Sequence, residues 1–109
     1  MKDIRFFLQE FGKRHPDLRI APMVNMNSDK EMYFYLVDKL ENAKKHSDGS
    51  ESSTYICDRY EFLVSFMKSC VIKGGFPPEV TEFRRRVAKL PPAQRDKEFH
   101  RTLALISKW

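Results

Sequence analysis

The segment STYICDRYEFLVSFMKSCVIKGG, residues 53–75, is the most apolar part of the chain and decides the predicted fold. Its large apolar side chains recur every three or four residues, which is the spacing of one helix face. They are Ile56, Tyr60, Leu63, Met67 and Cys70 or Val71, with Phe62 and Phe66 beside them. Gly74 and Gly75 follow as a left-handed helix end. The pattern predicts an apolar helix over residues 53–73 that the rest of the chain surrounds.

Four further helices are predicted around this segment from the same periodicity. They cover residues 2–14, 28–46, 79–90 and 93–108. Pro91 and Pro92 separate the last two, because proline interrupts a helix but suits the first turn of the next. We therefore expect an all-α domain of about five helices.

Two helix starts carry capping signals. Asp3 is available as a cap for the first helix, and Ser28 with Glu31 forms a capping box for the second. The buried stripe expected for the second helix is Tyr33, Leu36, Val37 and Leu40. Between these helices, residues 17–27 contain Pro22 and are expected to form an extended connector that packs Ile20, Met23 and Val24 on the core.

The chain has 109 residues, of which 41% are hydrophobic, so a single domain over residues 1–109 with one core is expected. The stretch HSDGSESS, residues 46–53, has no apolar member and is predicted to be a flexible polar loop. No apolar run approaches the roughly 20 residues of a membrane span. The charged start and the two cysteines fit an intracellular protein, cytoplasmic or nuclear, that is not secreted.

The positive charge is concentrated at one end of the chain. Residues 83–109 contain eight Lys or Arg and only two Asp or Glu, whereas residues 1–82 contain twelve and thirteen. A local excess of this kind creates a usable electrostatic potential.

Catalytic and metal-site motifs are not found in the sequence. Gly74 and Gly75 lack the lysine and the spacing of a phosphate-binding loop. Cys57 and Cys70 lie in the most apolar segment, and as members of one helix they would be roughly 20 Å apart, too far to share a zinc ion. We therefore expect a non-catalytic protein with no metal and no cofactor.

The sequence TEFRRRVAKLPPAQRDKEFHR, residues 81–101, fits either a polyanion-binding surface or the ordinary solvated face of two packed helices, and we adopt the first as the working prediction. Arg86 is expected to pair with Glu82, while Arg85 and Lys89 share a helix ridge with no acid beside them. Arginine donates two parallel hydrogen bonds to a phosphate, so nucleic acid or a nucleoprotein assembly is the expected partner. The residues expected to contact phosphates are Arg84, Arg85, Lys89, Arg95 and Arg101.

The alternative is a protein–protein adaptor or a small inhibitor whose arginines meet an acidic partner. Arginine and aromatic residues dominate the binding energy of many interfaces. The aromatic anchors expected in that case are Tyr35, Phe76 and Trp109. An exposed aromatic patch between the basic residues would favour the adaptor, and a basic ridge without apolar neighbours would favour nucleic acid.

Overall fold

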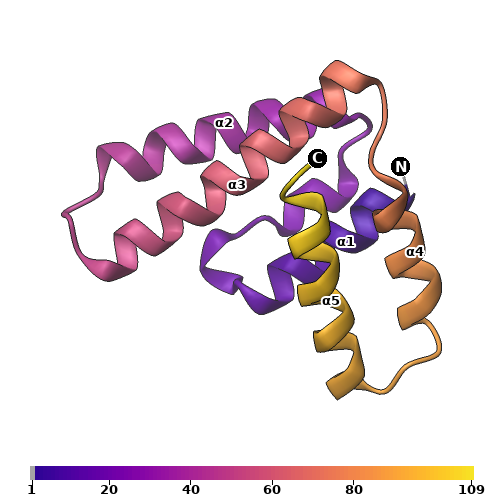
Figure 1. The fold of residues 1–109 in the computed structure, drawn as a ribbon. Helices are drawn as coiled ribbons and strands as arrows, with labels where there is room; N and C mark the ends of the chain where they lie inside the picture. The colour runs from indigo at the N-terminus through magenta and orange to yellow at the C-terminus, as the bar shows by residue number, and fades with distance from the viewer. Residues whose placement is uncertain (1) are drawn as a thin grey trace.

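The computed structural model describes residues 2–109 and confirms an all-α domain with five α-helices. In Figure 1, α2 and α3 form a long hairpin, α4 and α5 form a shorter one, and α1 lies between the two hairpins. Two short 3-10 turns, η1 and η2, connect α1 to α2. The bounds are α1 Lys2–Arg14, η1 Pro16–Leu18, η2 Ala21–Asn25, α2 Asp29–Lys45, α3 Glu51–Lys73, α4 Pro78–Val87 and α5 Pro92–Ile106.

Helix α3 forms as the apolar periodicity predicts, but the rest of the chain does not surround it: α3 packs chiefly against α2, and the central helix is α1. Its buried residues are Tyr60, Leu63, Phe66, Met67 and Cys70. Gly74 ends it with a φ of 71°, a left-handed conformation that glycine adopts at no steric cost. At the other end, the hydroxyl of Ser50 accepts a hydrogen bond from the amide of Ser53 at 3.2 Å.

The loop between α2 and α3 is shorter than the predicted span of residues 46–53, because residues 51–53 already form the first turn of α3. Asp48 organises this loop: its Oδ1 accepts hydrogen bonds from the Ser50 amide at 2.9 Å and from the Ser53 hydroxyl at 3.1 Å. These hydrogen bonds lower the pKa of the exposed Asp48 carboxyl to about 2. The carboxylate thus stabilises the start of α3.

Helix α2 begins at the predicted cap, but its buried face differs from the predicted one. The Ser28 hydroxyl accepts from the Glu31 amide at 3.1 Å, while the Glu31 carboxylate accepts from the amide of Asn27 at 3.4 Å rather than from that of Ser28. Only Met32 and Leu36 are fully buried in α2, whereas the other members of the predicted stripe, Tyr33, Val37 and Leu40, are only partly so. The hairpin covers α2 on one side alone, so a single row of side chains faces α3.

The segment between α1 and α2 is not the extended connector that the sequence suggested, since it forms η1 and η2. Ile20 and Met23 pack on the core as predicted, and Val24 is half-buried. Two tyrosines fix this segment: Tyr60 donates to the Leu18 carbonyl at 2.6 Å, and Tyr35 donates to the Arg19 carbonyl at 3.1 Å.

The core is built around the fully buried ring of Phe7 in α1. Rings from every helix except α2 converge on it. Their centroids lie 6.5 Å away for Phe11, 6.1 Å for Phe66, 5.9 Å for Phe83 and 5.4 Å for Phe99. Aromatic pairs at 4.5–7 Å stabilise a core beyond the area that they bury. Phe7 thereby joins α1 to α3, α4 and α5.

Arg14 closes the edge of this core. Its guanidinium lies 4.3 Å from the centre of the Phe99 ring and 2.7 Å from the carboxylate of Asp96, which fastens α1 to α5. The buried Glu10 carboxylate pairs with Arg14 at 3.4 Å and with Lys13 at 3.0 Å.

Replacing Phe7 with alanine is expected to lower the free energy of unfolding by about 3–5 kcal/mol, because it leaves a cavity where four elements meet. Urea denaturation followed by circular dichroism measures this loss. Phe34→Ala is the matched control, since Phe34 is 55% exposed and its loss should cost less than about 1 kcal/mol. Equal losses in the two variants would show that Phe7 is not the centre of the core.

Candidate basic binding surface

The apolar residues of α4 all lie on one side of the helix, which leaves its three arginines on the surface. Val80, Phe83 and Val87 are buried, and this places the side chains of Arg84, Arg85 and Arg86 outside the core. Pro78 occupies the first turn of α4, where the missing amide hydrogen costs no helical hydrogen bond.

One side of α4 forms an open depression of about 460 Å³. Its basic residues are Arg84, Arg85 and Lys89, all exposed and all from consecutive turns of the α4 region. The other lining residues are Asp3, Thr81 and Ala88. We call these six residues the α4 depression. Three of the five predicted phosphate-contacting residues therefore lie together.

Asp3 is the one acid in the α4 depression. One carboxylate oxygen lies 3.0 Å from the Arg84 guanidinium, and the other accepts a hydrogen bond from the Thr81 hydroxyl at 3.0 Å. The Arg84 hydrogen bond is the main cause of a lowered Asp3 pKa, against the opposing effect of burial. Asp3 lies inside the first turn of α1, so it is not the cap that the sequence suggested.

The ion pairs of α4 differ from those predicted. Arg85, not Arg86, pairs with Glu82, at 3.1 Å. Arg86 reaches across to Glu98 of α5 at 3.6 Å. The ridge of Arg85 and Lys89 thus has an acid beside it, although both side chains of the Arg85–Glu82 pair remain open to solvent and exposed pairs of this kind are weak.

Arg101 lies in a second cavity, of about 210 Å³, between α4 and α5. It shares Glu98 with Arg86, each at 3.6 Å. The lining includes the acids Glu79 and Glu82, so the charges there are mixed. Arg101 is a member of this cavity rather than of the α4 depression.

Arg95 contributes to the turn between α4 and α5. Its Nε donates a hydrogen bond to the Leu90 carbonyl at 3.0 Å, and the residue is half-buried. The sequence predicted only a phosphate contact for Arg95. The residue directly before two prolines lacks a helical partner for its carbonyl in this turn, and Arg95 supplies one.

The three aromatic residues considered as interface anchors all pack against the core. The Tyr35 hydroxyl is bonded to the Arg19 carbonyl, and Phe76 is half-buried. The Trp109 ring lies 6.2 Å from that of Phe66, with the Lys73 ammonium 4.2 Å from its centre. The large apolar side chains that are exposed are instead Phe34, Tyr55, Ile72 and Leu105.

Both cysteines are at least half-buried, and His46 is placed at a helix end. Burial raises the pKa of the Cys70 thiol to about 12, and Cys57 is half-buried. His46 ends α2, with Nδ1 3.0 Å from the Asn42 carbonyl. Across residues 2–109, no group of three or more His, Cys, Asp or Glu side chains is arranged to hold a metal ion.

Comparison of the chain with protein-family models, with curated proteins and with solved structures finds no match. None of the helices within residues 2–109 is long and apolar enough to cross a membrane.

Replacing Asp3 with asparagine is expected to lower the free energy of unfolding at pH 7 by ~0.5–1 kcal/mol, as for a partly exposed ion pair. Because folding lowers the Asp3 pKa, the stabilisation is complete above the ordinary value of 3.8 and is lost as the pH falls through the lowered value. Urea denaturation at several pH values should show the two proteins converging in acid.

Asp58→Asn is the control for this comparison, since Asp58 is exposed and makes no ion pair among residues 2–109. A constant difference between the Asp3 variant and the unmodified protein at every pH would contradict a role for the Asp3 charge.

Proposed function

We propose that this chain is a non-catalytic binding protein that docks a polyanion, most simply a nucleic acid backbone, in the α4 depression. The observation that carries the proposal is the lining of the depression: Arg84, Arg85 and Lys89 face one open hollow that contains a single acid, Asp3. Lys89 makes no ion pair within residues 2–109, so its charge is available.

The chemistry of these side chains suits phosphates. Guanidinium groups bind phosphate oxygens through two parallel hydrogen bonds, and an ammonium group adds a charge without strict geometry. The Thr81 hydroxyl supplies a further donor beside Arg84. The carboxylate of Asp3 already uses Arg84 and Thr81 together, so the same two donors suit another anion of similar shape.

Binding is expected to be insensitive to base sequence. Base readout usually uses Arg, Asn or Gln near the start of a recognition helix, and α5 offers only Gln94 and Arg95 there. Arg95 is engaged with the Leu90 carbonyl. Backbone contacts alone give affinity and salt dependence without discrimination between sequences.

Replacing Arg84, Arg85 and Lys89 with alanine is expected to weaken binding to labelled DNA or RNA by more than about tenfold at low salt. Each phosphate contact that is lost should reduce the slope of log affinity against log salt by about one. Fluorescence anisotropy with single- and double-stranded probes over a salt series measures both quantities, and circular dichroism checks that the variant keeps its helices.

The matched control replaces Lys30, Lys45 and Lys68 with alanine. These lysines are exposed on α2 and α3, and their replacement removes the same net charge as the first triple substitution. Equal weakening in the two triple variants would mean that net charge, not the α4 depression, binds the probe. Absence of binding by the unmodified protein at low salt would remove the nucleic-acid proposal altogether.

Asp3→Asn is expected to tighten binding about two- to fivefold, which corresponds to ~0.5–1 kcal/mol. The carboxylate competes with phosphate for Arg84 and Thr81, and its negative charge repels the ligand. The same anisotropy assay measures this gain, and Asp58→Asn controls for the change in net charge. A gain of the same size in both variants would contradict direct competition by Asp3.

The second candidate is a protein–protein adaptor. It is favoured by the cavity between α4 and α5, where Leu105 is 47% exposed beside Arg86 and Arg101. An apolar side chain flanked by arginines is a common composition of protein interfaces. The adaptor function is supported if the protein binds none of the nucleic acid probes but binds an acidic protein, and if Leu105→Ala abolishes that binding.

A further inference from the structure

Arg59 of α3 is a half-buried cation that has no ion-pair partner among residues 2–109. Its Nε is fully buried and makes no hydrogen bond. Its own helix supplies no acid three or four residues away, where the residues are Tyr55, Ile56, Phe62 and Leu63. A buried donor without a partner destabilises a fold unless an ion or a water molecule satisfies it. Arg59 therefore points to a ligand that the chain does not itself provide.

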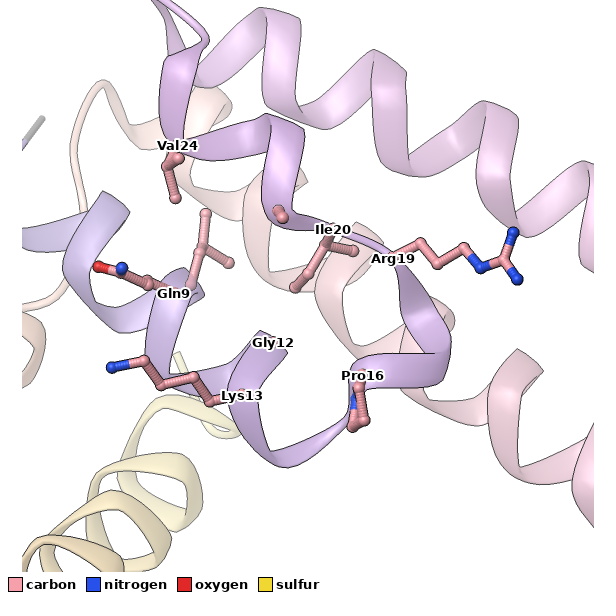
Figure 2. Close-up of a pocket in the computed structure, with 9 residues that line it drawn as sticks. Gln9, Gly12, Lys13, Pro16, Arg19, Ile20 and Val24 are labelled. Carbon is pink, nitrogen blue, oxygen red and sulfur yellow. The ribbon is translucent and has the colours of Figure 1, made fainter. Parts of the chain in front are cut away.

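His15 shares a neighbour with Arg59. It lies in the turn that follows α1, and Figure 2 shows this turn, where the chain enters η1 at Pro16. The His15 ring contacts those of Phe11 and Tyr55, whose centroids are 4.8 Å and 5.7 Å away. The guanidinium of Arg59 lies 5.1 Å from the centre of the same Tyr55 ring. Tyr55 thus brings His15 and Arg59 into one group.

The hydrogen bonding of His15 leaves one ring nitrogen available. The Tyr55 hydroxyl is hydrogen-bonded to Nδ1 of His15. When the hydroxyl donates, the neutral ring carries its proton on Nε2. Nε2 has no hydrogen-bond partner in the part of the chain that the structure describes, and it is not among the fully buried polar atoms. It is therefore open to a ligand that accepts a hydrogen bond.

The charges that act on His15 are all positive. Burial lowers the pKa of His15 below its ordinary value of 6.5, and the cations Arg59, His100 and Arg14 lower it further. Arg14 is already paired with one carboxylate of α1 and one of α5. The charge without compensation is that of Arg59, with those of His15 and His100 when they are protonated. An anion at this place would relieve the repulsion.

The acids near this group leave it uncompensated. Asp17 and Glu51 line an open hollow beside Tyr55, but neither forms an ion pair within residues 2–109. Neither is among the charged groups that shift the pKa of His15. An anion that binds His15 and Arg59 would therefore displace no intramolecular ion pair.

We propose that His15, Arg59 and His100 form a site for a small phosphate-type oxyanion. Nε2 of His15 and the guanidinium of Arg59 donate hydrogen bonds to its oxygens, and His100 adds a charge from α5. The bound anion joins α1, α3 and α5, so it stabilises the packing of these helices. None of the three residues belongs to the α4 depression, so the site does not depend on the proposed polyanion binding.

Titration of ¹⁵N-labelled protein with sulfate or inorganic phosphate, at an ionic strength held constant with chloride, tests the proposal by two-dimensional NMR. We expect saturable shifts of the side-chain signals of His15 and Arg59. Arg59→Gln should weaken binding about fivefold or more, as for the loss of a charge-assisted hydrogen bond. Lys68→Gln is the matched control, because Lys68 is an exposed cation of α3 without an ion pair among the described residues.

The pH dependence of binding is a second test, which uses the unmodified protein and so does not depend on the folding of a variant. The affinity for sulfate should rise as the pH falls from about 8 to about 5, because the anion favours protonated His15 over the neutral ring. Sulfate keeps its charge over this range, so the change reports on the protein. His15→Gln keeps a hydrogen-bond donor but does not titrate, and it should flatten this dependence.

The two proposed anion sites are separated by the variant in which Arg84, Arg85 and Lys89 are replaced with alanine. This variant should keep the shifts of His15. Their loss there would place the anion in the α4 depression and overturn the proposal. So would an absence of saturable shifts at His15, or equal weakening in Arg59→Gln and Lys68→Gln. Shifts of His15 with an oligonucleotide but not with free sulfate or phosphate would also overturn it, since the ligand would then be a nucleic acid backbone.

Discussion

The burial of the Phe7 ring is the contact on which the other features of this structure depend. Rings from α1, α3, α4 and α5 surround it, with centroids within 6.5 Å. Because Phe83 and Phe99 face Phe7, the remaining sides of α4 and α5 are turned toward solvent. The exposure of Arg84, Arg85 and Arg86 thus follows from aromatic packing, because these three residues come directly after the buried Phe83.

The α4 depression and the hollow between α1 and the η1–η2 segment differ in the residues that line them. The α4 depression is shallow and open, and its charges come from one short helix with Asp3 of α1 at its edge. The hollow between α1 and the η1–η2 segment (Figure 2) is lined mainly by apolar residues, and tyrosines of α2 and α3 donate hydrogen bonds to the carbonyls of Arg19 and Leu18 beside it. Charged residues thus dominate the α4 depression, and apolar residues dominate the other hollow. Helix α1 contributes residues to both.

The sequence predicts best what depends on a single helix. The helix over residues 2–14 and the caps at Ser28 and Gly74 follow from local spacing, and the structure has them. Contacts between two helices are not predicted from the sequence. Arg86 pairs with Glu98 rather than with Glu82, because α5 brings a closer acid than its own helix does. Asp3 and Thr81 are 78 residues apart, and no local pattern signals their contact.

The position of Phe7 along the chain has a consequence for how the protein is made. Helix α1 leaves the ribosome before its partners, whereas Phe83 and Phe99 are among the later residues. Until those rings emerge, the apolar stripe of α1 has only the connector and α3 to cover it. Apolar surface that is exposed in this way makes a partly synthesised chain prone to association. The aromatic core around Phe7 can therefore be complete only after α5 has left the ribosome.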